Sequence, residues 1–184
     1  MKENKCKEYK KEKTYEKLDI YNENRIKTGK IIERKEDVEI NENEFVLAVQ
    51  CWIINSQNKI LLTKRKQDKV CGGMWEPTSG LVQLGENSIQ GIKRELKEEI
   101  GITIDDNDLK ILKTVKESHT FRDIYIINKE IPVETIKFND GEVIDAKYVT
   151  IDELKQMIDS GEAFEWLRWF IDEYKMNDKE MKKI

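Results

Sequence analysis

The segment Gly80–Ile102 constrains this 184-residue chain more than any other part of it. Within Ser88–Ile100, apolar residues recur at steps of three and four, which predicts an α-helix with one buried stripe. Glu95, Glu98 and Glu99 stand at i, i+3 and i+4 beside this stripe and should lie close together. Carboxylates held so close repel one another unless a cation lies among them, and Mg²⁺ prefers oxygen ligands. The spacing therefore favours a divalent-metal site that would meet a phosphate.

A cluster of glutamates is more often a solvated helix face, particularly in a chain of which 38% is charged. The residues around the helix argue against that interpretation here. Gly80 and Gly85 allow the chain to turn tightly before the helix, and Gly101 supplies a left-handed stop after it. Loop, helix and stop together fit one site.

The whole segment reads Gly, five residues, Glu, seven residues, and then Arg-Glu-aliphatic-any-Glu-Glu-any-Gly-aliphatic. This pattern resembles the Nudix box at every defined position, and chance would produce its fixed identities about once in 10⁸ starting positions. The resemblance implies an α/β/α sandwich with a mixed β-sheet, over about residues 18 to 175. We expect one Nudix domain at 18–184, with the box at 80–102, after a charged, solvated leader at 1–17.

The resemblance also implies roles for the residues of the box. Glu95, Glu98 and Glu99 would bind Mg²⁺ or Mn²⁺, and Arg94 would hold these carboxylates in place. Glu86 would pair with Arg94 and would not touch the metal, as an outer residue that orients a metal site. Gly80 and Gly101 would be structural.

The general base is open between two residues, because members of this family draw it either from the box helix or from a later loop. Glu98 and Glu142 are the candidates. Glu142 follows Asp140-Gly141 at the start of an expected strand, so a plain polar turn residue is an equal alternative.

Two residues upstream of the box are candidates for substrate binding. Arg65 ends an expected strand and could meet the phosphates, although charged strand ends are usually solvated. Trp75 could stack on a base, although a tryptophan in this position is more often a core residue. His119, the one histidine of the sequence, has no matching nucleophile motif and is assigned no catalytic role.

We expect hydrolysis of a phosphoanhydride bond in a nucleoside diphosphate linked to another moiety, by water attacking phosphorus. The alternative from another class is a Nudix-fold sensor that binds a nucleotide without turnover. A looser resemblance extends to isopentenyl-diphosphate isomerases, which carry Cys-Gly-His where this chain has Ser79-Gly80-Leu81. Because both the thiol and the metal-binding histidine are missing there, isomerase activity is not expected.

Periodicity outside the box predicts strands near 18–21, 30–34, 45–54, 59–63, 109–115, 121–127 and 143–149. Turn signals lie at Asn22–Arg25, Thr28-Gly29 and Asn55–Asn58. Thr150-Ile-Asp-Glu153 is a capping-box pattern that predicts a helix over Ile151–Ser160, and Phe164–Tyr174 has the spacing of a third helix.

Composition excludes several classes of protein. The 33 basic and 37 acidic residues are interspersed, so no basic stripe indicates nucleic-acid binding. The leader lacks the apolar run of a signal peptide or membrane helix, which favours a cytoplasmic protein without membrane partners. Cys6, Cys51 and Cys71 are too few and too irregular for a disulfide framework or a zinc site. A small nucleotide or diphosphate is the expected partner, and a homodimer stays open.

Overall fold

A mixed β-sheet lies at the centre of the protein in the computed structural model, which describes residues 15–35, 39–139 and 141–181. The main path of the sheet runs β5-β4-β3-β8-β7, and β6 pairs with β3 and β9 with β4. The central pair, β3 and β8, is parallel, whereas every other pair is antiparallel. The strands are β3 (Val46–Ile54), β4 (Ile60–Arg65), β5 (Trp75–Glu76), β6 (Ser79–Leu81), β7 (Lys110–Glu117), β8 (Thr120–Asn128) and β9 (Val143–Val149).

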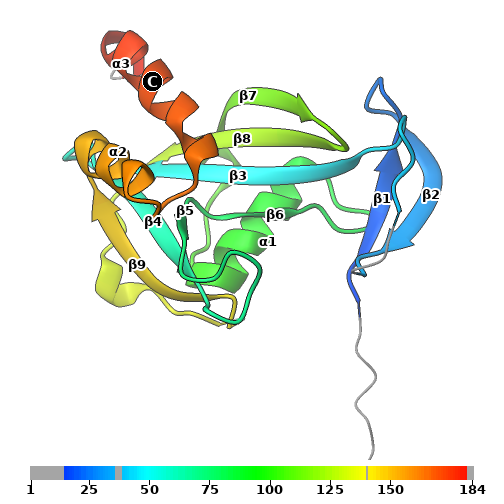
Figure 1. Ribbon diagram of the computed structural model, residues 1–184, viewed down its shortest axis with the longest axis horizontal. Coiled ribbons are helices and arrows are strands. Elements are labelled where there is room, and N and C mark those ends of the chain that lie inside the picture. The colour runs from blue at the N-terminus through cyan, green and yellow to red at the C-terminus, as the bar shows by residue number, and fades with distance from the viewer. Residues whose placement is uncertain (1–14, 36–38, 140, 182–184) are drawn as a thin grey trace, which may run out of the picture.

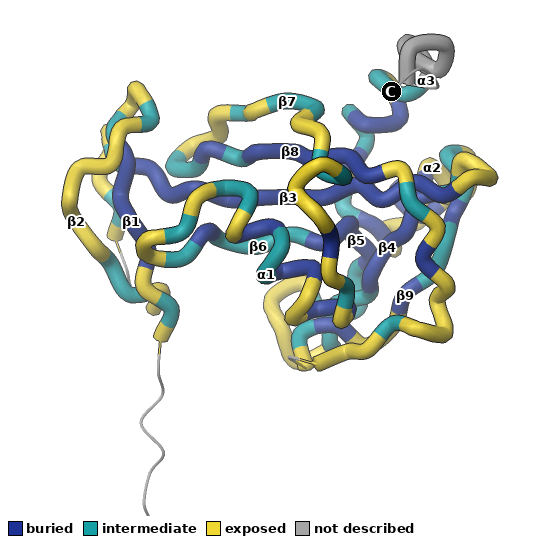
Figure 2. Tube along the Cα trace, turned by 180° about the vertical axis from the view of Figure 1, so that it is seen from behind, coloured by how far each residue is buried: buried dark blue, intermediate teal, exposed yellow. Residues whose placement is uncertain are grey.

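Helices cover both faces of this sheet, as the sandwich predicted from the sequence requires (Figure 1). Every residue of β3 is buried, because the strand contributes alternate side chains to two cores (Figure 2). Val49, Cys51 and Ile53 face the core under α1 (Ser88–Ile100), whereas Trp52 and Ile54 face the core under the two later helices. The predicted α/β/α architecture is confirmed.

The helix α1 has the bounds expected from the sequence. Asn87 forms a reciprocal capping box with Gln90, and Gly101 closes the helix in the left-handed conformation at φ 73°. Ile92, Leu96 and Ile100 are fully buried, which confirms the predicted stripe. The helix is therefore fixed at both ends and along one face.

The second core lies beneath α2 (Ile151–Asp159) and α3 (Arg168–Met181). The predicted capping box of Thr150 and Glu153 is present at the start of α2. The helix expected from residue 164 begins as a 3₁₀ turn, Glu165–Leu167, and becomes α-helical at Arg168. Phe170 stacks on Trp52 of β3 at 3.6 Å between ring centroids. In the described ranges, no helix combines the length and the apolar character needed to cross a bilayer.

A separate two-stranded hairpin, β1 (Lys17–Tyr21) and β2 (Lys27–Glu33), packs beside the main sheet (Figure 1). Its turn is Asn22–Arg25, where Asn22 Oδ1 accepts from the backbone N–H groups of Asn24 and Ile26. The second expected turn, Thr28-Gly29, is wrong, because both residues lie inside β2. Only residues 1–14 of the expected leader lie outside the described residues, and Lys17 already belongs to a strand.

Candidate active site

The carboxyl group of Glu95 packs directly against the backbone of β6 at Gly80. A Cβ atom added to Gly80 would stand 2.1 Å from both Cδ and Oε1 of Glu95. Any larger side chain at this position would displace the Glu95 carboxyl, which gives the first glycine of the box its physical reason. Since β6 pairs with the buried β3, this part of the site rests on the centre of the sheet.

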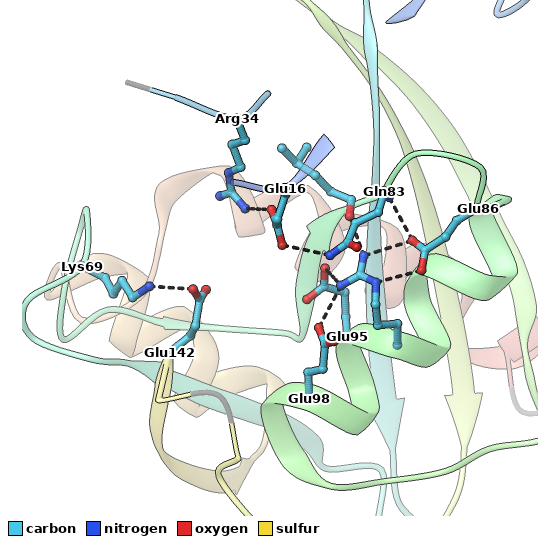
Figure 3. A network of polar contacts seen from close by, with 10 residues as sticks. Glu16, Arg34, Lys69, Gln83, Glu86, Glu95, Glu98 and Glu142 are labelled. Carbon is cyan, nitrogen blue, oxygen red and sulfur yellow. Dashed lines mark hydrogen bonds and ion pairs between the residues drawn. The ribbon is translucent and has the colours of Figure 1, made fainter. Parts of the chain in front are cut away.

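The guanidinium of Arg94 connects the box loop with the helix (Figure 3). It donates to both carboxylate oxygens of Glu86, at 2.9 and 3.1 Å, which is the pairing expected from the sequence. Nη2 also donates to the carbonyl of Leu81 at 2.8 Å, and Nη1 donates to Glu95 at 2.8 Å and to Glu98 at 2.9 Å. Arg94 therefore holds one acid from the loop and two from the helix.

The three helix carboxylates differ in exposure. Glu95 and Glu99 are buried, at 9% and 7% exposed, whereas the side chain of Glu98 is 46% exposed. Burial raises the pKa of Glu95 to about 7, although the positive charge of Arg94 opposes the shift. Of the three, Glu98 has the carboxylate with the freest access to water.

The metal-binding role expected for Glu95, Glu98 and Glu99 stays a prediction. Among the described residues, no group of three or more acidic, histidine or cysteine side chains is arranged so that it could hold a metal ion. Arg94 compensates the charges of Glu95 and Glu98, because both carboxylates pair with its guanidinium. The donor chemistry still fits Mg²⁺ or Mn²⁺, because all three side chains offer carboxylate oxygens and Glu95 is seated against Gly80.

Glu142 lies on a different loop from the Arg94 cluster and points toward Lys69 (Figure 3). Its Oε1 accepts from Lys69 Nζ at 2.6 Å, and its carbonyl accepts from the backbone N–H of Lys66 at 2.8 Å. Glu142 therefore ties the loop after β4 to the start of β9, and its role as a base stays a prediction.

The two upstream candidates are both engaged within the protein. Arg65 donates through Nη1 to Glu76 at 2.6 Å and through Nε to the carbonyl of Val70 at 3.0 Å. Trp75 is 5% exposed and belongs to the second core, with the Nζ atom of Lys147 4.3 Å from its ring centroid. The structure therefore favours the core interpretation of Trp75, because its buried ring leaves no open face for a base.

The hairpin contributes contacts to the box loop that the sequence did not indicate. The backbone N–H of Leu84 donates to the carbonyl of Lys17 at 2.7 Å, and that of Gly85 donates to Asp19 Oδ2 at 3.0 Å. Gln83 also donates to Glu16 at 3.1 Å (Figure 3). One available signal was Asp19, an acid inside the otherwise apolar run Leu18–Tyr21 of β1.

The histidine and the cysteines have no place in this site. His119 lies in the turn between β7 and β8, with Nδ1 3.3 Å from the carbonyl oxygen of Glu44. Burial raises the pKa of the Cys51 thiol far above its usual range, which keeps it protonated. Cys71 is exposed on the loop after β4, and Cys6 lies outside the described residues.

Comparisons with known proteins agree with this geometry. The family model described as the NUDIX domain matches residues 44–170. An uncharacterized Nudix hydrolase of Listeria monocytogenes is 33% identical over 149 residues, which cover 80% of this chain and 87% of the relative. A crystal structure of a Deinococcus radiodurans protein has a TM-score of 0.67 at 24% identity, covering 80% of this chain and 91% of that one. An isopentenyl-diphosphate Delta-isomerase of Klebsiella pneumoniae is 28% identical and covers 65% of this chain and 67% of the relative.

Fold, box and relatives together define a Nudix-type pyrophosphohydrolase. The chain belongs to the Nudix family.

Proposed function

We propose that this protein is a metal-dependent hydrolase that cleaves the phosphoanhydride bond of a nucleoside diphosphate linked to another moiety. The observation that carries the proposal is the seating of Glu95 against Gly80, with Arg94 joining Glu86, Glu95 and Glu98 beside it. A protein that only binds a nucleotide has no chemical need for such a set of acids, whereas an enzyme that hydrolyses a diphosphate needs them to hold a cation.

Glu95, Glu98 and Glu99 would hold Mg²⁺ or Mn²⁺. When bound, such a cation neutralises charge on the diphosphate and makes the leaving phosphate less basic. Arg94 keeps Glu95 and Glu98 oriented, and Glu86 fixes Arg94 in turn. Glu98 is our first candidate for accepting a proton from the attacking water, because its side chain is the most exposed of the three. Glu142 is the second candidate.

A sensor that binds a nucleotide without turnover is the alternative. Isomerase activity is not proposed despite the isomerase relative, because Ser79-Gly80-Leu81 supplies neither the thiol nor the histidine of that enzyme. A cytoplasmic location and a possible homodimer stay predictions from the sequence. No membrane or nucleic-acid partner is proposed.

The test is release of phosphate and nucleotide from a panel of substrates with and without Mg²⁺. The panel contains ADP-ribose, nucleoside diphosphate sugars, NADH, dinucleoside polyphosphates, nucleoside triphosphates and isopentenyl diphosphate. Glu98→Gln removes one carboxylate charge from the proposed site, and Glu134→Gln, at an exposed acid of the 3₁₀ turn Val133–Thr135, is the matched control.

Metal-dependent cleavage of one substrate class, lost in Glu98→Gln and kept in Glu134→Gln, is the expected result. Saturable binding of one compound without turnover of any would replace the hydrolase with the sensor.

A further inference from the structure

A cavity of about 290 Å³ lies on the face of the sheet opposite α1. Its floor comes from β3, β8 and β7, and two tryptophans from the start of α3 and the turn before it form a wall. The volume is at the lower end of small-ligand sites, so it suits one ring system and not a whole dinucleotide. The lining residues that the argument uses are Gln50, Lys113, Arg122, Ile124, Trp166 and Trp169.

Gln50 offers an unsatisfied hydrogen-bond donor to this cavity. The side chain is fully buried, and its Oε1 accepts from the indole N–H of Trp52 at 3.1 Å. Because an indole nitrogen can only donate, this contact fixes the amide orientation and leaves Nε2 as the free end. Nε2 is buried and has no hydrogen-bond partner within the described part of the chain. A buried amide of this kind is costly unless a ligand or a water accepts from it.

Arg122 supplies a second donor to the same cavity. Its Nε is also buried without a hydrogen-bond partner among the described residues, while Nη2 reaches Glu117 at 3.3 Å. Arg122 and Ile124 lie on β8 beside Ala48 and Gln50 of β3, so the two donors point from neighbouring strands. The bound group must therefore bring an acceptor.

The tryptophan wall provides a flat apolar surface. Trp166 is 40% exposed, an unusual exposure for so large a ring, and the guanidinium carbon of Arg122 lies 5.7 Å from its centroid. One face of Trp169 is covered by Lys113, whose Nζ is 3.6 Å from the centroid. A planar ring could stack on Trp166 while its edge meets the two donors.

The pairing of β3 with β6 brings the floor of the cavity close to the candidate active site in the sheet. Gln50 is paired with Ser79, the neighbour of Gly80, against which the Glu95 carboxyl packs. A ligand with a ring in the cavity could extend its phosphates along β6.

We propose that this cavity is the subsite for the nucleobase of the substrate and that it selects a base with a ring carbonyl. This proposal rests on the hydrolase function proposed above. A carbonyl oxygen has two lone pairs and can accept from both Gln50 Nε2 and Arg122 Nε. Guanine, cytosine and uracil carry such an oxygen, whereas adenine does not. The ring stacks on Trp166.

The test separates base binding from catalysis. Calorimetric titration of the metal-free protein in EDTA with GMP, CMP, UMP and AMP measures the subsite alone. The variants are Trp166→Ala, Trp166→Phe and Gln50→Glu, which keeps the oxygen that accepts from Trp52 and replaces the donor. Phe138→Ala is the control, because Phe138 is as exposed as Trp166, at 41%, and does not line the cavity.

We expect the three carbonyl bases to bind more tightly than AMP in the wild type. Trp166→Ala should weaken them by about 10-fold or more, with partial recovery in Trp166→Phe and no change in Phe138→Ala. Gln50→Glu should remove the difference between the carbonyl bases and adenine. In hydrolysis with Mg²⁺, the loss in Trp166→Ala should appear in KM and leave kcat unchanged, because stacking is equal in substrate and transition state.

Two results would overturn the subsite: binding of AMP as tight as that of the carbonyl bases, or an unchanged Kd and KM in Trp166→Ala. If metal-dependent hydrolysis persisted in that case, the proposed function would stand without the subsite. Base binding that depends on Trp166 without hydrolysis of any substrate would support the subsite and refute the hydrolase.

Discussion

Replacing Gly80 with alanine should separate activity from stability. The new Cβ would stand 2.1 Å from the Glu95 carboxyl, which must retreat to the 3.4 Å of an ordinary contact, a movement of about 1.3 Å. This carboxyl is the far end of a flexible side chain, so we expect the free energy of unfolding to fall by less than about 1 kcal/mol. A misplacement of about 1 Å in a catalytic group can cost about 100-fold in rate, and we expect a loss of that order in kcat/KM.

The assay is kcat/KM for the best substrate of the panel, beside urea unfolding of the same samples. Gly161→Ala is the matched control, because Gly161 has a left-handed φ of 79° with open space around its missing Cβ. This control should lose about 1 kcal/mol of stability through backbone strain and keep its activity. Activity of Gly80→Ala within threefold of the wild type would refute the idea that Glu95 must lie against β6.

Arg94→Lys should lower the free energy of unfolding by about 2 kcal/mol and reduce turnover. The reason is that lysine cannot bind Glu86 through two parallel hydrogen bonds while also reaching the carbonyl of Leu81. Calorimetry measures the stability, and steady-state kinetics measure the turnover. Glu76→Gln tests how stability depends on pH. Burial raises the pKa of Glu76 in the folded state above its usual 4.5. The stability of the wild type relative to this variant should therefore fall as pH rises from about 4.5 through the folded pKa. A pH-independent difference in urea unfolding would remove Glu76 as the titrating group. Asn87→Ala breaks the capping box of α1 and should cost about 1 kcal/mol, measured as a lower Tm.

The elements of the fold that could be predicted from the sequence are those with strong local signals. The helix α1 was predicted to the residue because its apolar stripe and the stop at Gly101 agree, whereas its Asn87 cap was found only in the structure. The hairpin of β3 and β4 follows from β-branched runs around Asn55, whose Oδ1 accepts from the N–H groups of Gln57 and Lys59. The parallel pairing of β3 with β8 carries no local signal, and the family resemblance supplied the topology instead.

The candidate site was predictable where residues lie close in the sequence. The pairing of Glu86 with Arg94 was expected and is present. Trp75 was ambiguous because burial of its ring depends on α2 and α3, which lie far later in the chain. Gln50 and Arg122 could not be found at all, since a polar residue in a buried strand becomes informative only once its unsatisfied nitrogen is located.

The hairpin of β1 and β2 lies before residue 44, where the match to the family domain begins, yet its backbone and Asp19 accept hydrogen bonds from the box loop at Leu84 and Gly85. The boundary of the family domain is therefore not the boundary of the working unit. A protein trimmed to residues 44–170 would keep all the acids of the box and lose the partners of the loop that carries the first of them. Substitutions in this hairpin should accordingly act on the order of the box loop, although not one of its residues belongs to the box.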